Sequence, residues 1–188
     1  MGLAAGFVIM MLAAIGAGDG LKAGEHRGDP SHGDRQERQI EKGSNERNVE
    51  YIVPVEGVVP RSLVDTWGAV RSEGRSHEGI DIFAKRNTPV IASIDGRIVR
   101  QGVSERGGNV VWVVGDDGRR HYYAHLEAFS EHRTGQRVKR GETIGYVGNS
   151  GNAITTPPHL HYGVYTSQGA INPYPLLTGK EIEEIAAE

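Results

Sequence analysis

The sequence predicts a mainly β domain with a disordered N-terminal tether and a short C-terminal helix. Glycine supplies 27 of the 188 residues and aromatic residues only 6%, which favours short strands and tight turns over a helical bundle. From residue 51 onward, short β-rich runs alternate with breaks that contain glycine. Helix signals are absent until residue 178. A chain of this length suits one folded domain with extensions.

Residues 1–18 form one apolar run without a charged side chain. A signal-peptide core needs about 7–15 apolar residues and a membrane-spanning helix about 20, so this run lies between the two. Small residues at Ala14, Gly16 and Ala17 could supply a cleavage site, but the basic flank of an export signal is missing. We expect either a signal peptide or an uncleaved anchor that attaches the protein to the membrane.

Residues 19–50 differ sharply in composition from the rest of the chain. They carry eight acidic and six basic side chains and no aromatic residue. Such a segment cannot bury enough apolar surface to offset the entropy lost on ordering, so a disordered linker is expected. Its two histidines, His26 and His32, are interpreted as solvated linker residues.

Residues 51–177 carry the pattern of the folded domain, and the expected strands are 80–83, 90–93, 97–101, 110–114, 119–126, 143–147 and 161–166. Residues 115–118, Gly-Asp-Asp-Gly, predict a hairpin turn between the fourth and fifth of these. The C-terminal helix is expected over residues 178–188, with Thr178 as its N-cap and acidic residues in its first turns.

Net charge and cysteine content exclude several classes of protein. The formal net charge of -3 is too small to indicate a nucleic-acid partner. Cysteine is absent, so disulfides and thiolate metal sites are excluded.

His77 and Asp81 are the first candidate metal ligands. In a straight strand, residues four apart lie about 13 Å from each other, too far to share an ion. Gly79 and the β-rich residues after it argue against a helix here. We expect a loop that turns at Gly79 and enters a strand at Ile80, so that His77 folds back toward Asp81.

His159 and His161 form the second candidate pair. In a strand both imidazoles face one side, about 7 Å apart along the backbone, while Leu160 points into the core. Both could ligate one ion, or one could ligate while the other faces the substrate. His125 lies in the expected strand at residues 119–126. Strict alternation in that strand would place His125 on the same face as His121, which is expected to be partly buried.

Three motifs in this order resemble the LytM/lysostaphin-type zinc endopeptidases of peptidase family M23. They are Arg-Ser-His-Glu-Gly-Ile-Asp at residues 75–81, Tyr-Ala-His-Leu at 123–126 and His-Leu-His at 159–161. The resemblance implies a mainly antiparallel β-sheet domain over residues 51–177, with a groove. It also implies a peptidase exported to the periplasm or cell envelope, which acts on peptidoglycan peptides.

The resemblance further implies the roles of five side chains. His77, Asp81 and His161 would bind one Zn²⁺ per chain, with a water in the fourth position. His125 and His159 would be catalytic, acting on that water and on the oxyanion of the tetrahedral intermediate. Two departures from the family concern groove shape: a longer segment at residues 148–158, and Gly163 in place of a frequent acidic residue.

Three other functions compete with this interpretation. A catalytically inactive homologue could activate other wall hydrolases, although such proteins typically lose ligands or catalytic histidines that this chain keeps. An iron(II) oxygenase also uses two histidines and a carboxylate, but the remaining histidines would be unexplained. A lipoyl-type carrier would need a lysine in a tight hairpin of a kind that this sequence lacks.

Overall fold

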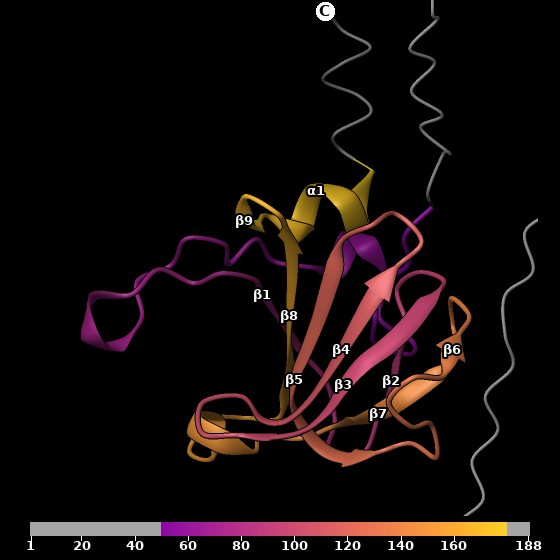
Figure 1. Ribbon diagram of the computed structural model, residues 1–188. Coiled ribbons are helices and arrows are strands. Elements are labelled where there is room, and N and C mark those ends of the chain that lie inside the picture. Colours follow the sequence, from indigo (N-terminus) through magenta and orange to yellow (C-terminus); the bar gives the residue numbers. More distant parts are fainter. Residues whose placement is uncertain (1–49, 180–188) are drawn as a thin grey trace, which may run out of the picture. The chain divides into compact units, whose positions relative to one another are not determined.

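Nine strands, all paired antiparallel, form one sheet within residues 50–179, the part of the chain that the computed structural model describes (Figure 1). The strands are β1 (Ile80–Phe83), β2 (Pro89–Ile91), β3 (Gly96–Ser104), β4 (Gly108–Gly115), β5 (Arg120–Phe129), β6 (Arg137–Val138), β7 (Thr143–Val147), β8 (His159–Thr166) and β9 (Gly169–Ile171). The helical elements are the 3₁₀ turns η1 (Pro60–Ser62), η2 (Ser72–Gly74) and η3 (Gly151–Ala153) and the helix α1 (Pro173–Thr178). The predicted antiparallel β fold is therefore confirmed.

The sheet branches at its central strand, β5. Its main path runs β1-β8-β5-β4-β3-β6. The first half of β5 pairs with β4 and β8, whereas its second half pairs with β7, which in turn pairs with β2. Residues from both branches of the sheet form one apolar core. Its fully buried members include Ile80, Val90, Val111, Val113, Leu126, Ile144, Val147 and Leu160.

The turn between β4 and β5 is the hairpin expected from Gly-Asp-Asp-Gly. The amide of Gly115 donates to the carbonyl of Arg119 at 2.9 Å, and the amide of Gly118 donates back to Gly115 at 3.0 Å. Gly118 adopts a φ of 77°, a left-handed conformation that glycine reaches at little cost.

A short helix, α1, lies at residues 173–178, just before the helix that the sequence predicts for residues 178–188. Asn172 caps α1, its side-chain oxygen accepting from the amide of Tyr174 at 2.9 Å, and Pro173 occupies the first turn. Thr178 is the last residue of the helix rather than an N-cap, because Gly179 takes a φ of 73° and closes it. The segment after it, residues 180–188, lies outside the described residues.

The expectations for residues 1–18 and for most of the linker, residues 19–49, also lie outside the described part of the chain. Within residues 50–179, no helix is long and apolar enough to cross a membrane.

Candidate metal centre and groove

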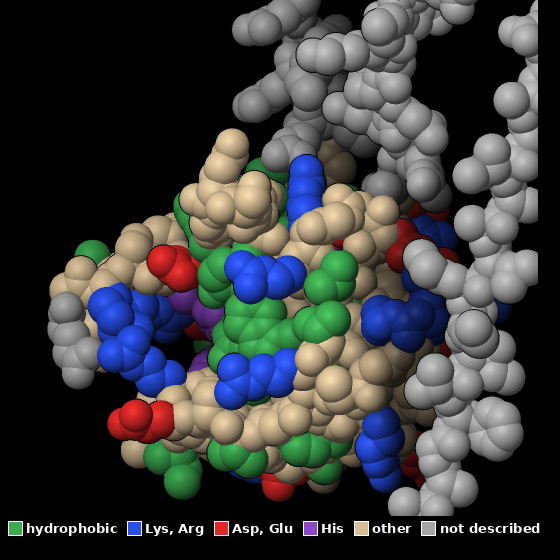
Figure 2. Space-filling model, in the orientation of Figure 1, with side chains coloured by type: hydrophobic (Ala, Val, Ile, Leu, Met, Phe, Trp, Pro, Cys, Tyr) green, Lys and Arg blue, Asp and Glu red, His purple; other side chains and the backbone are tan. Residues whose placement is uncertain are grey.

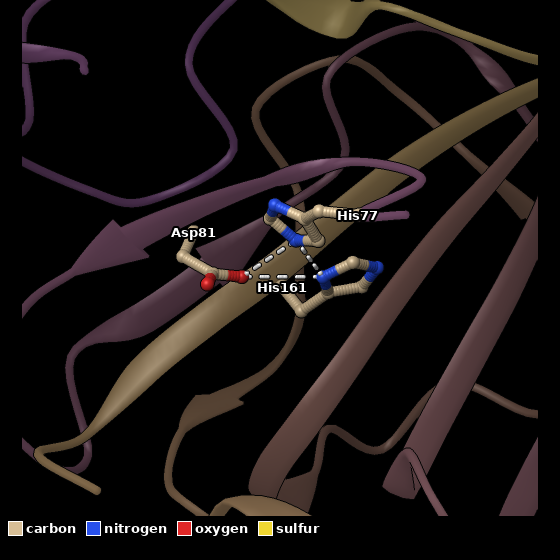
Figure 3. A group of neighbouring side chains, drawn as sticks. All are labelled: His77, Asp81 and His161. Atoms are coloured by element: carbon tan, nitrogen blue, oxygen red, sulfur yellow. Dashed lines mark hydrogen bonds and ion pairs between the residues drawn. The ribbon is translucent and has the colours of Figure 1, made fainter. Parts of the chain in front are cut away.

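His77, Asp81 and His161 converge on one point (Figure 3). The Nε2 atom of His77 lies 2.9 Å from Nδ1 of His161 and 3.1 Å from Oδ1 of Asp81. The third edge, from His161 Nδ1 to Asp81 Oδ1, is 3.2 Å. A tetrahedral ion with bonds of about 2.0–2.2 Å separates its ligand atoms by about 3.4 Å, so this triangle fits a metal ion with little movement.

The pairing of β1 with β8 places two of these ligands side by side. Asp81 is directly opposite His161 in the register. Ile80 and Ile82 point into the core, so alternation turns the Asp81 side chain to the other face of the sheet. Leu160 is fully buried, which places His159 and His161 together on that outer face, as predicted.

Gly79 lets His77 fold back to this pair. The chain bends at Gly79 and β1 begins at Ile80, as the sequence predicts. A Cβ atom on Gly79 would lie 2.5 Å from the carbonyl oxygen of Tyr162 and 2.8 Å from Cε1 of His161. Only glycine therefore fits where the loop crosses β8.

Thr66 fixes the orientation and tautomer of His77. The Nδ1–H of His77 donates to the backbone carbonyl of Thr66 at 2.7 Å, so its Nε2 carries the lone pair that faces the other ligands. The Thr66 hydroxyl also accepts from the amide of Asp81 at 3.0 Å. One residue thus positions both ends of the His77–Asp81 loop.

Asp81 is held as a carboxylate. Burial opposes its ionisation, but the neighbouring His161 and His77 rings and the Arg71 guanidinium outweigh burial and hold its pKa far below the usual range. Its Oδ1 faces the two imidazoles, and Arg71 forms an ion pair with its Oδ2. Arg71 was not expected at the site from the sequence, since nothing in the local pattern relates it to Asp81.

His125 and His159 stand beside the triangle. Their ring centroids lie 5.1 Å apart, and that of His125 lies 5.9 Å from the ring of His161. The Nδ1–H of His125 donates to the carbonyl of Ser150, and that of His159 to the carbonyl of Pro157, each at 2.9 Å. Both rings therefore present Nε2, and that of His159 lies 4.0 Å from Oδ1 of Asp81.

His125 reaches this place through a bulge, so the alternation predicted for β5 is wrong at this residue. Val111 pairs with Tyr123 and Asn109 with Leu126, which leaves one extra residue on β5. His125 takes a φ of 63° there and turns to the outer face. Tyr123 stays in the core on the inner face.

His121 also remains on the inner face, and it is fully rather than partly buried. Its Nδ1 lies 2.8 Å from the Tyr162 hydroxyl and its Nε2 3.3 Å from the Asp117 carboxylate. The Tyr51 hydroxyl donates to the same carboxylate at 2.7 Å. This buried polar network belongs to the core and takes no part in the metal centre.

Burial lowers the pKa of His125 to about 4, and the neighbouring His161 and His159 act in the same direction, against the raising effect of the Ser150 carbonyl. The ring is therefore neutral at neutral pH, and its Nε2 is available to accept a proton.

The centre lies in a groove of about 850 Å³. One wall contains Arg71 and Arg75 from the loop before β1. The other contains Asn152, Thr156 and Pro157 from the long segment before β8. Phe83 also lines the groove, 59% exposed and with its ring centroid 5.2 Å from that of His159.

The chain is similar to characterised families and structures. The family model described as Peptidase family M23 matches residues 75–173. An L-Ala–D-Glu endopeptidase of Bacillus subtilis (strain 168) is 38% identical over 144 residues, covering 70% of this chain and 44% of the relative. A glycyl-glycine endopeptidase, ALE-1, of Staphylococcus capitis is 39% identical over 110 residues, covering 55% of this chain and 30% of the relative.

The chain thus spans less than half the length of these two curated relatives. The catalytic domain of the antimicrobial peptidase lysostaphin from Staphylococcus simulans superimposes with a TM-score of 0.54 at 34% identity. That match covers 58% of this chain and 86% of the lysostaphin domain.

Proposed function

Because this chain belongs to peptidase family M23, we propose that it is a zinc metallo-endopeptidase that hydrolyses peptide bonds in peptidoglycan stem or cross-link peptides. The observation that carries the proposal is the triangle of ligand atoms, with edges of 2.9–3.2 Å, beside two further imidazoles. A carboxylate and two neutral imidazoles suit Zn²⁺ and leave a position for a water.

In this proposal His77, Asp81 and His161 hold one Zn²⁺ per chain. When bound, Zn²⁺ supplies a Lewis acid and a water of lowered pKa. Thr66 keeps the His77 ring in place through its carbonyl, and Arg71 holds the outer oxygen of Asp81. Such supporting contacts orient ligands and sustain their affinity for the metal.

His125 and His159 carry out the proton transfers of the reaction. Each is anchored through Nδ1 to a backbone carbonyl and offers Nε2 to the groove. Between them they accept the proton of the attacking water, donate a hydrogen bond to the oxyanion and return the proton to the leaving amine. His125 is neutral at neutral pH, because burial lowers its pKa to about 4, so its Nε2 carries no proton before the reaction.

The layout of the whole chain follows from this function. Residues 51–177 are the peptidase domain, and residues 19–50 a charged linker that lets it reach its substrate. Residues 1–18 act as a signal peptide or membrane anchor, which places the domain in the periplasm or cell envelope. The substrate is extracytoplasmic peptidoglycan, in keeping with the L-Ala–D-Glu and glycyl-glycine endopeptidases among the relatives.

Incubation of the purified full chain with isolated sacculi tests the proposal. We expect soluble fragments to be released, a chelator to stop release, and added Zn²⁺ to restore it. Mass spectrometry of the fragments identifies the bond that is cut. Metal binding without cleavage of any wall peptide would overturn the proposal and favour an inactive homologue that activates other hydrolases.

A further inference from the structure

A row of aromatic and arginine side chains crosses the outer face of the sheet beyond the metal centre. Arg100 of β3 is directly opposite Trp112 of β4, and Trp112 is opposite Tyr122 of β5. One step farther from the metal centre, Arg120 of β5 is opposite Tyr165 of β8. These five residues are called the arginine–aromatic strip.

The aromatic members of the strip pack against one another. The ring centroid of Trp112 lies 4.4 Å from that of Tyr122 and 5.3 Å from that of Tyr165. Gly163, the departure noted in the sequence, lies opposite Tyr122. A Cβ on Gly163 would lie 3.0 Å from Cε2 of Tyr165, so a larger residue here would press against the tyrosine ring.

The strip is continuous with the catalytic groove. The ring of Tyr122 lies 5.8 Å from that of His161, and both Tyr122 and Tyr165 line the groove. Burial and the neighbouring Glu78 carboxylate raise the pKa of Tyr165 to about 12. Its hydroxyl therefore stays protonated and can donate a hydrogen bond to a ligand.

Two guanidinium groups give the strip a positive charge. Arg120 lies over the Trp112 ring, 5.9 Å from its centroid, and Arg100 stands across the strand pair from the same tryptophan. Within residues 50–179, neither arginine forms an ion pair with a carboxylate. Figure 2 shows an apolar patch on this face of the protein, with basic side chains on either side of it and histidines next to it.

This arrangement favours a carboxylate over a sugar ring as ligand. Stacking on Trp112 holds the Arg120 guanidinium in place and leaves its hydrogen-bond donors unused by the ring. Because that guanidinium lies over the tryptophan ring, this face of the ring is not open to a sugar. A guanidinium matches the two oxygens of a carboxylate.

We propose that the arginine–aromatic strip binds a carboxylate of the peptide substrate, so that the enzyme prefers anionic stem peptides to neutral glycine bridges. This inference rests on the proposed function. Arg120 precedes Ala124, the neighbour of His161, by four residues of β5, which is about 13 Å. The recognised carboxylate then lies about four extended residues from the bond that is cut.

Steady-state kinetics on synthetic peptides test the proposal. The substrates are a cross-linked stem peptide with free carboxylates, the same peptide with those carboxylates converted to amides, and pentaglycine. Two double variants of the full chain are compared with wild type. In the Gln pair both Arg100 and Arg120 are changed to Gln, and in the Lys pair both are changed to Lys. The control is Arg137→Gln on β6, whose exposed ion pair with Asp116 contributes little.

The Gln pair should raise KM for the carboxylate peptide about tenfold and leave kcat unchanged, since only binding is lost. The amidated peptide should be cut equally by wild type and variant, and the Lys pair should recover part of the affinity. The Arg137 variant should match wild type.

Equal KM values for carboxylate and amide peptides in the wild type, or preferential cleavage of pentaglycine, would overturn the inference while leaving the proposed function intact. Cleavage of none of the three peptides would count against the proposed function instead. Calorimetric titration of the carboxylate peptide into wild type and the Gln pair then decides the inference, because binding needs no turnover. Equal affinities would overturn it.

Discussion

The Nε2 atom of His77 lies 2.9 Å from the Nδ1 atom of His161, although 84 positions separate the two residues. His77 already donates its Nδ1–H to the Thr66 carbonyl, so its lone pair points at His161. Asp81 adds an ionised oxygen to the same point. Three electron-rich atoms held this close form a site that a cation stabilises.

His161→Ala should abolish metal binding. The variant leaves one imidazole and one carboxylate, and two ligands do not hold a divalent ion at the affinity of three. The measurement is the metal content per chain after dialysis, which should fall from about one ion to near zero. His132→Ala is the matched control, because His132 lies in a loop, where its ring contacts Glu142 rather than the metal ligands. This variant should leave the metal content unchanged. Retention of metal by the His161 variant would exclude the assigned site.

His125→Ala should keep the metal and lose turnover. His125 lines the groove but is not one of the three grouped ligands, so we expect it to contribute proton transfer. Loss of a general acid or base lowers kcat by about 10²–10⁴. Metal analysis and a sacculus-release assay on one preparation separate the two effects. Wild-type cleavage by this variant would remove His125 from the mechanism.

Gly79→Ala should destabilise the fold and distort the metal centre. The added methyl group would overlap the Tyr162 carbonyl and the His161 ring, and overpacking of this kind costs about 1–3 kcal/mol. Gly102→Ala is the control, since no atom lies within 4 Å of the position of its Cβ. Denaturant unfolding and metal titration of both variants should show losses for Gly79 alone. An unaffected Gly79 variant would mean that the loop crosses β8 differently.

Asp117→Asn should weaken the protein at neutral pH but not in strong acid. Burial opposes ionisation of Asp117, yet hydrogen bonds from His121 and Tyr51 outweigh it and lower its pKa to about 2. An unfolded aspartate titrates near 3.9, so the ionised group stabilises the fold above about pH 4. This stabilisation disappears as the pH falls through about 2.

Unfolding free energies of wild type and the Asn variant should therefore differ by about 1–2 kcal/mol at pH 7 and converge near pH 2. Asp116→Asn is the neighbouring control, because its ion pair with Arg137 is exposed. A difference that stays constant with pH would show that the ionisation of Asp117 contributes nothing.

The sequence alone determined several strands, including β1 with Asp81, and placed β8 with a start two residues late. β1 and β7 were predicted with their observed bounds, and the Gly-Asp-Asp-Gly hairpin was predicted with its turn. Alternation within β8 was enough to place His159 and His161 on one face, because side-chain direction in a regular strand depends only on local geometry.

Only the tertiary structure decided how the other groups meet. The bulge that turns His125 outward arises from the pairing of β5 with β4, and no local pattern marks it. The ion pair of Arg71 with Asp81, and the complete burial of His121, likewise depend on which strands and loops become neighbours. The direction of a side chain within a strand depends on its position in the local sequence. The register between strands and the burial of a side chain depend instead on which segments come together on folding.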